Sequence, residues 1–137
     1  MKVYIIGITG MLGSCLFLNF INNNKFQVKG SLRLKNYKYF VNYKKNIDLN
    51  NDVKNFENLK KKILSFKPDY VINCVGWVKQ KKEKKKTSKF LNSKFPHLLN
   101  NFLKINNIRL IHFSTDCIFS GKKATYEITD KPVSFDL

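Results

Sequence analysis

Three glycines near the start of the chain are spaced as in a turn that holds a phosphate group. Gly7, Gly10 and Gly13 recur at every third residue from the point where an apolar run stops. A strand that turns sharply into a helix needs glycine where φ is positive and where phosphate oxygens approach the free N–H groups of the helix. We expect Gly7 to make the turn, Gly10 to admit the phosphates and Gly13 to bring the helix close to the strand. Ordinary strand-to-helix turns have the same spacing, so the glycines alone leave both interpretations open.

Small or polar residues also lie at the ends of three other apolar segments. Arg33 lies about 20 residues after the glycine turn, Gly76 follows the segment 69–75, and Thr115 comes shortly after the segment 108–113. At the position of Arg33, a basic side chain accommodates the extra phosphate of NADP, whereas an acidic one would bind the ribose of NAD. Arg33 therefore favours NADP, and a role as one surface cation among many stays open.

The elements that must position these residues are predicted by hydrophobic periodicity. Strands are expected at 3–8, 26–34, 69–75 and 108–113, helices at 11–21, 56–66 and 87–106, and a loop with at most a short element at 35–51. Strands joined by helical crossovers form a mostly parallel sheet with helices on both faces, so we predict an α/β fold, a Rossmann-type doubly wound parallel sheet. Its ligand crevice lies at the carboxyl ends of the strands, where the residues above fall.

The same periodicity assigns side chains to the core. The inward residues of the first and last helices are expected to be Leu12, Leu16 and Phe20, and Leu91, Phe95, Leu98, Leu99 and Phe102. We expect Pro96 to bend the last helix. Cys15 and Cys74 are expected to be small core residues, and His112 to be packed within its strand rather than to act as a base or ligand.

Composition narrows the class of protein. The 137 residues favour a single domain, and no apolar run is long enough for a membrane span, so we expect a soluble cytoplasmic protein. Three widely spaced cysteines favour reduced thiols over disulfides or a metal site. The net charge of +17 suggests nucleic-acid binding, but only Arg33 and Arg109 of the 26 basic residues are arginine. Base recognition usually relies on arginine, so specific nucleic-acid binding is not favoured. A positive field would still speed the approach of an anionic ligand.

Four motifs together resemble the dTDP-4-dehydrorhamnose reductase (RmlD-like) family of extended short-chain dehydrogenases/reductases. They are Gly7-Ile-Thr-Gly-Met-Leu-Gly13, Lys67-Pro-Asp-Tyr-Val-Ile-Asn-Cys-Val-Gly76, Asn92 with Phe95-Pro96, and Arg109-Leu-Ile-His-Phe-Ser-Thr-Asp-Cys-Ile-Phe-Ser-Gly121. The part 114–121 is the most specific. With Val78-Lys-Gln80, it is most similar to members that reduce 4-keto groups on nucleotide-activated deoxysugars. Bacterial relatives of this kind help to make rhamnose-like or acetamido-fucose-like cell-surface sugars.

The resemblance implies roles for individual residues. The cofactor is implied to be NADP, with NAD as the alternative, and its pyrophosphate would lie against Gly7, Thr9, Gly10, Met11, Leu12 and Gly13. Asp48 and Leu49 would lie beside the adenine, and Val75, Gly76 and Trp77 along the middle of the cofactor. Lys79 and Gln80 would touch the nucleotide-sugar substrate. Thr115 would be the catalytic hydroxyl that orients the keto oxygen, although a strand-end threonine can also simply cap a turn.

The chain departs from the family in lacking its catalytic Tyr-x-x-x-Lys motif. None of the six tyrosines has a lysine four residues later, and Tyr126 is followed at that spacing by Asp130. We therefore expect residues 1–137 to be an NAD(P)-binding Rossmann domain that is incomplete at its C-terminus. Without the remaining helix one sheet face would be exposed, so we expect marginal stability, a homo-oligomer or a complementing C-terminal polypeptide.

Three classes of function remain open. The first is the cofactor-binding part of an NADP-dependent reductase that acts on the 4-keto group of a nucleotide-activated deoxysugar. The second is a non-catalytic nucleotide-binding regulatory subunit, because the family resemblance extends to the beta subunit of methionine adenosyltransferase. The third is a basic protein associated with nucleic acid, whose binding would weaken steeply with salt.

Overall fold

Five parallel strands form a single sheet in the computed structural model, which describes residues 1–34, 38–77, 85–114, 119–123 and 125–131. The strands are β1 (Lys2–Ile6), β2 (Gln27–Ser31), β3 (Ile47–Asp48), β4 (Tyr70–Asn73) and β5 (Arg109–His112). Their order across the sheet is β3-β2-β1-β4-β5. The chain starts in the middle strand, adds strands to one side, and then crosses to the other side, as in a doubly wound sheet.

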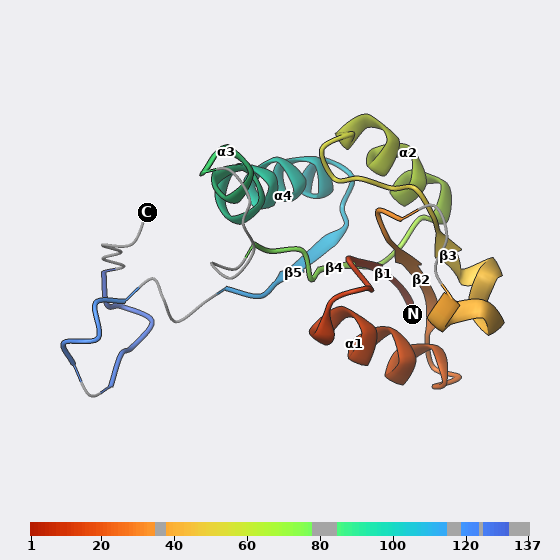
Figure 1. Cartoon of the computed structure of the whole chain (residues 1–137), viewed down its shortest axis with the longest axis horizontal. Coiled ribbons are helices and arrows are strands. Elements are labelled where there is room, and N and C mark those ends of the chain that lie inside the picture. Colours follow the sequence, from red (N-terminus) through yellow and green to blue (C-terminus); the bar gives the residue numbers. More distant parts are fainter. Residues whose placement is uncertain (35–37, 78–84, 115–118, 124, 132–137) are drawn as a thin grey trace.

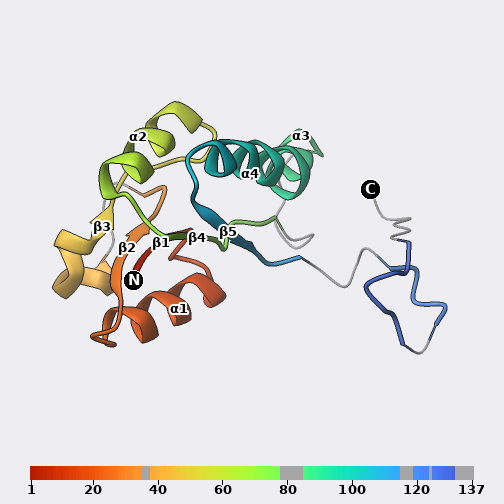
Figure 2. The same ribbon diagram turned by 180° about the vertical axis from the view of Figure 1, so that it is seen from behind.

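Helices lie on both faces of this sheet (Figure 1). The helical elements are α1 (Met11–Ile21), the 3₁₀ segment η1 (Lys38–Asn46), α2 (Phe56–Phe66), α3 (Lys85–Lys89), the π-helical turn η2 (Phe90–Lys94) and α4 (Phe95–Ile105). Seen from either side, α1 lies on one face, and α2 and α4 lie on the other (Figures 1 and 2). None of the helices that the structure describes is long and apolar enough to cross a membrane. The predicted Rossmann-type α/β fold is confirmed.

Each face of the sheet has its own hydrophobic core, because side chains alternate along a strand. Tyr4 and Ile6 of β1 point toward α2 and α4, whereas Val3 and Ile5 point toward α1. The first core also contains Leu59, Ile63, Phe95, Leu99 and Leu103 from the helices. The middle strand β1 is therefore buried on both sides, which fixes the glycine turn at its carboxyl end in a rigid frame.

The helix α1 is rotated relative to the predicted orientation. Its buried residues are Gly13 and Phe17, whereas Leu12 and Cys15 are exposed, so their predicted core positions are wrong. The cause is the close approach of Gly13 to the preceding turn, which brings that side of the helix against the sheet and turns Leu12 outward. Cys74, at the end of β4, is half-buried and packs against the core on this face, as expected.

The last predicted helix, 87–106, is divided in three. Pro96 does not bend it from within, because it lies in the first turn of α4, where a missing N–H breaks no helical hydrogen bond. The helical hydrogen-bond pattern changes instead at η2, where the N–H of Phe95 donates to the carbonyl of Phe90. On α4, Leu99 and Leu103 are buried, and Leu98 is exposed rather than inward.

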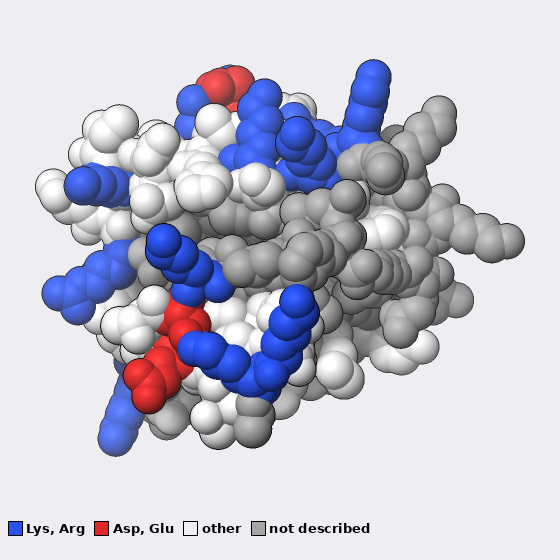
Figure 3. All heavy atoms as spheres, turned by 90° about the vertical axis from the view of Figure 1, so that its left-hand side faces the viewer, with Lys and Arg blue, Asp and Glu red and all other residues white. Residues whose placement is uncertain are grey.

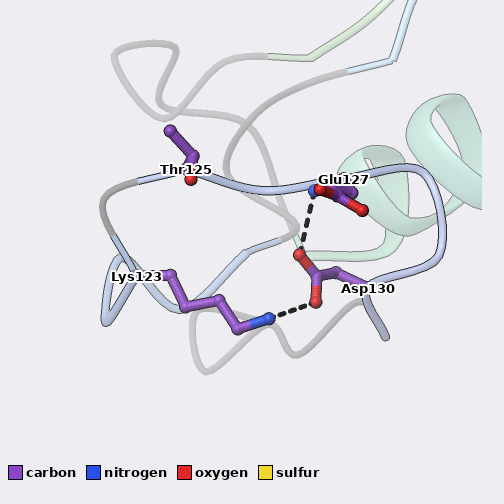
Figure 4. A pocket seen from close by; sticks show the side chains of 4 residues that line it. All are labelled: Lys123, Thr125, Glu127 and Asp130. Carbon is purple, nitrogen blue, oxygen red and sulfur yellow. Dashed lines mark hydrogen bonds and ion pairs between the residues drawn. The ribbon is translucent and has the colours of Figure 1, made fainter.

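The C-terminal part of the described chain extends away from the sheet (Figures 1 and 2). Residues 119–123 and 125–131 include a stacked aromatic pair, Phe119 and Tyr126, with ring centroids 4.4 Å apart. Lys123 forms an ion pair with Asp130, which also accepts a hydrogen bond from the backbone N–H of Glu127 at 2.9 Å (Figure 4). Lys123, Thr125, Glu127 and Asp130 line an open hollow of about 510 Å³ in this exposed turn, which is built only from local contacts.

Candidate functional site

The turn after β1 has a backbone that only glycine readily adopts. Gly7 has φ +87°, and a Cβ atom there would lie 2.7 Å from the Cγ2 atom of Val75. The N–H groups of Gly7 and Ile8 both donate to the carbonyl of Ser31, at 3.0 and 3.2 Å. The turn is therefore held between the ends of β2 and β4, as its predicted role requires.

The N-terminus of α1 is open to a ligand. A Cβ atom on Gly13 would lie 2.3 Å from the carbonyl oxygen of Gly7, so the helix rests directly on the turn. Gly10 is the N-cap, and no side chain caps the helix. The first turn, Met11 to Gly13, carries N–H groups without partners inside the helix. Together with the helix dipole, they attract an anion.

A cleft of about 210 Å³ lies beside this turn, at the carboxyl ends of the strands. Four segments and two helical elements, α3 and η2, contribute its lining: Ile6, Gly7, Thr9 and Gly10; Ser31, Leu32 and Arg33; Asn51, Asp52, Val53 and Lys54; Cys74, Val75, Gly76 and Trp77; and Thr87 and Leu91. The sheet topology explains this gathering, since parallel strands end at the same edge. Two cations, Arg33 and Lys54, share the cleft with the open helix N-terminus.

The segment after β4 is held in place by Asn92 of η2. The Asn92 side chain accepts a hydrogen bond from the backbone N–H of Trp77 at 2.7 Å and donates to the carbonyl of Trp77 at 3.0 Å. The side-chain oxygen of Asn73 accepts the N–H of Val75 at 3.1 Å. The side-chain amides of Asn73 and Asn92 therefore hold the two ends of the segment 75–77, whose backbone forms one wall of the cleft.

One buried polar atom at the cleft, Nε1 of Trp77, lacks a hydrogen-bond partner within the described part of the chain. Buried polar groups are nearly always paired in proteins, so this atom points to a polar ligand. With the glycine turn, the open helix end and two cations, the cleft is polar and positively charged, which suits an anionic ligand.

Asp48 belongs to a buried network instead of the cleft lining. It accepts a hydrogen bond from the Tyr4 hydroxyl at 2.8 Å, and the ammonium groups of Lys29 and Lys62 lie 3.4 and 3.8 Å from its Oδ1. Burial and the Asp48 carboxylate raise the pKa of Tyr4, so its hydroxyl stays protonated and donates. The exposed Leu49 does not line the cleft either. The adenine contacts of Asp48 and Leu49 therefore stay predictions.

His112 is exposed, so the prediction that it is packed within its strand is wrong. It lies on β5, which is the edge of the described sheet. Its Nδ1 atom lies 3.1 Å from the side-chain nitrogen of Asn73, and partial burial lowers the pKa of His112. A neutral ring that accepts from Asn73 fits this geometry, and it orients the amide that holds Val75.

The structure brings together seven of the predicted cofactor residues as lining of one cleft: Gly7, Thr9, Gly10, Arg33, Val75, Gly76 and Trp77. Met11, Leu12 and Gly13 form the helix turn beside it. The predicted substrate residues Lys79 and Gln80 and the predicted catalytic Thr115 lie outside the described residues. In the described part of the chain, no group of His, Cys, Asp and Glu side chains could hold a metal ion.

Sequence reasoning missed the part of the lining formed by residues 51–54. They follow β3, which is only two residues long and gave no periodic signal. Thr87 and Leu91 were placed on a helix but not at the cleft. The Asx turn of Asp52, whose Oδ1 accepts the N–H of Lys54 at 2.9 Å, was the available local signal.

The parallel sheet, the glycine turn at its middle strand and the cleft at its carboxyl edge define a Rossmann-type fold. The family comparison agrees: the model of the RmlD substrate binding domain matches residues 1–135. The chain belongs to this family. The predicted resemblance is thereby confirmed. A comparison with curated proteins gave no match.

Solved structures of sugar-nucleotide enzymes have the same fold. ADP-L-glycero-D-manno-heptose-6-epimerase from Helicobacter pylori superposes with a TM-score of 0.82 at 15% identity, covering 98% of this chain and 46% of the epimerase. A hypothetical dTDP-4-dehydrorhamnose reductase from Sulfolobus tokodaii gives 0.77 at 22% identity, with coverage of 98% and 46%. The Bordetella bronchiseptica enzyme WbmG, in complex with NAD and UDP, gives 0.80 at 18% identity, with coverage of 98% and 44%. The chain thus spans less than half the length of these proteins.

Proposed function

We propose that this chain is the NADP-binding part of an oxidoreductase that reduces the 4-keto group of a nucleotide-activated deoxysugar. The observation that carries the proposal is the cleft that joins the glycine turn, the open end of α1 and Arg33. Membership of the RmlD family supports the substrate class. The WbmG structure, which contains NAD and UDP, supports a dinucleotide beside a nucleotide sugar.

Different residues of the cleft bind different parts of the cofactor. The N–H groups of the first turn of α1 bind the pyrophosphate, with Gly7 and Gly13 keeping that turn close to the sheet. Arg33 pairs with the phosphate that distinguishes NADP from NAD, because a guanidinium binds phosphate oxygens through two parallel N–H groups. The backbone at Val75 to Trp77, fixed by Asn92, lies along the middle of the cofactor.

In the proposed reaction, the cofactor and the side chains of the protein have different tasks. When bound, NADPH supplies the hydride that reduces the keto carbon. The hydroxyl of Thr115 accordingly orients the keto oxygen, and Lys79 and Gln80 contact the substrate. Since no Tyr-x-x-x-Lys occurs in the 137 residues, we expect the chain by itself to bind NADPH without reducing a 4-keto sugar nucleotide. Turnover by the purified chain would contradict this division of labour.

Arg33→Ala tests the cofactor assignment. The variant should bind NADPH about 10- to 100-fold more weakly, as expected for the loss of hydrogen bonds to a charged group, and NADH with little change. Titration of NADPH and NADH by fluorescence or calorimetry measures both constants. The matched control is Arg109→Ala, because Arg109 is the other arginine of the chain and does not line the cleft. Equal weakening of NADPH and NADH by Arg33→Ala would overturn the assignment of its phosphate partner.

A further inference from the structure

Lys54 is a cation of the cleft to which the proposed function gives no role. It lies between β3 and α2, and it lines the cleft together with Arg33. Two backbone hydrogen bonds join the chain after β3 to the residues on either side of Arg33: from the Asn51 N–H to the Leu32 carbonyl at 2.9 Å, and from the Asn50 N–H to the Leu34 carbonyl at 3.0 Å. Lys54 therefore enters the cleft from the segment next to Arg33.

The loop that carries Lys54 is fixed by buried polar contacts. Asn51 is buried, and its side chain donates to the Tyr4 hydroxyl at 3.3 Å and accepts from the Asn58 amide at 3.2 Å. The backbone N–H of Lys54 donates to Oδ1 of Asp52 at 2.9 Å. The side chain of Lys54 is nevertheless exposed. An exposed cation on a fixed backbone can bind a ligand without the entropic cost of ordering a loop.

Charge pairing separates Lys54 from lysines that have a structural partner. Lys29 and Lys62 lie outside the cleft lining, and their ammonium groups are 3.4 and 3.8 Å from the carboxylate of Asp48. Within the described residues, no ion pair involves Arg33 or Lys54. The two cations of the cleft are therefore available to an anion that these parts of the chain do not supply.

The charge of a phosphate monoester requires more than one cation. Such a group carries about −1.5 to −2 charges at pH 7, and Arg33 supplies a single positive charge. Among the described lining residues, Asp52 is the other charged side chain besides Arg33 and Lys54, and one of its oxygens already accepts the Lys54 N–H. With Arg33 alone, the carboxylate of Asp52 would cancel the charge of the guanidinium. With Lys54 as well, the lining keeps a net positive charge.

We propose that Lys54 is the second cation for the phosphate that distinguishes NADP from NAD, and that it determines cofactor specificity together with Arg33. The pyrophosphate is the other anionic group of the cofactor, and the N–H groups of α1 beside β1 are assigned to it. β2 lies between β1 and β3 in the sheet, so the loop after β3 belongs to the Arg33 side of the cleft. This inference rests on the proposed function, because that function supplies the phosphate.

Two substitutions of Lys54 test the charge and the contact. Lys54→Met removes the ammonium and keeps an unbranched apolar side chain, whereas Lys54→Arg keeps the charge. Titrations by calorimetry should show NADPH binding about tenfold weaker in Lys54→Met and NADH binding changed by less than about twofold. Lys54→Arg should stay within about threefold of the unchanged chain for both nucleotides. The double variant Arg33→Ala with Lys54→Met should bind NADPH no more tightly than NADH.

A control must separate a direct contact from the general positive field of the protein. Lysine and arginine side chains project from much of the face drawn in Figure 3, and acidic side chains are few there. Lys61→Met removes the same charge from an exposed position on α2 that does not line the cleft. Because salt screens exposed charges, this variant should change NADPH affinity by less than about twofold at physiological ionic strength. Circular dichroism should show the same fold for all variants, since the substituted side chains are exposed.

The failure of this inference can be told apart from the failure of the proposed function. Equal weakening of NADPH and NADH in Lys54→Met would place Lys54 on a group that both cofactors share, and unchanged NADPH affinity would remove the contact. A loss in Lys61→Met as large as in Lys54→Met would reduce the effect to net charge. Each of these results overturns the role of Lys54 while Arg33→Ala can still abolish the preference for NADPH. An unchanged chain that binds neither nucleotide would overturn the proposed function and this inference together.

Discussion

The two faces of the sheet differ in how far helices of the described residues cover them. On one face, α2 and α4 cover β1, β4 and β5, and their core contains fully buried Leu59, Leu99 and Leu103. On the other, α1 covers β1 and β2, and the chain provides nothing in its described residues for β5. Both faces consist of apolar side chains. The difference shows that the apolar pattern of a strand specifies burial on both sides, whereas the helices of the described residues cover β5 on one side only.

The contrast also separates stability from binding. Both cores hold the fold together, and the elements that contribute the proposed pyrophosphate site, β1 and α1, meet on the α1 side. A change in the buried core of either face should destabilise the chain. A change at the exposed residues of the cleft should alter what the chain binds.

The largest expected effect comes from Leu99→Ala on the covered face. Deletion of a fully buried leucine side chain should lower the free energy of unfolding by about 2–5 kcal/mol, because transfer and cavity costs add. Ile111→Ala on the opposite side of β5 should cost less than about 1 kcal/mol, since Ile111 is partly in water already. Urea unfolding followed by circular dichroism measures both. Similar losses would mean that both faces are closed in solution.

A smaller effect is expected for α1, where two glycines have different tasks. Gly13→Ala puts a Cβ atom 2.3 Å from the Gly7 carbonyl oxygen, and this overpacking should cost about 2 kcal/mol. At Gly10 the nearest atom would be 3.6 Å away, so Gly10→Ala should cost less than about 1 kcal/mol. We expect Gly10→Ala nevertheless to weaken NADPH binding, because its new methyl group approaches the phosphate site. Unchanged affinity in a folded Gly10→Ala protein would contradict a pyrophosphate at that position.

The smallest effect concerns two thiols on the α1 side of the sheet. Burial raises the pKa of Cys74 to about 11, so little of it is thiolate at pH 8, whereas Cys15 is exposed on α1. Alkylation by iodoacetamide at pH 8, followed by peptide mass spectrometry, should modify Cys15 at least about tenfold faster than Cys74. A faster Cys74 would mean that the end of β4 opens readily.

Much of the fold could be predicted because its signals are local. The apolar runs around β1, β4 and β5 and the spacing of Leu59 and Ile63 are properties of short segments, and the structure confirms the elements. β3 was not predicted, since two residues, Ile47 and Asp48, are too few for a periodic signal. It is defined by pairing with β2, which is a tertiary contact.

The candidate site was predictable where backbone geometry carries it. Glycine spacing identified Gly7 and Gly13 because steric limits apply to the backbone whatever surrounds it. Burial was harder to predict for residues whose orientation depends on a neighbour. Leu12 and Cys15 point outward because Gly13 sets the rotation of α1. Asp48 was drawn into a network with Tyr4, Lys29 and Lys62, which lie on three other elements. No pattern within a short window contains such contacts.

The π-helical turn η2 has a consequence for how this chain can tolerate insertions and deletions. Its hydrogen bond spans five residues instead of four, so it behaves as one extra residue between α3 and α4. Deleting one residue there would restore a continuous α-helix and rotate everything before it by about 100°. Thr87 would leave the cleft, and Asn92 could no longer hold the backbone of Trp77. The register of the cleft wall thus depends on the length of this one turn, which makes it the position where a single-codon deletion should be least tolerated.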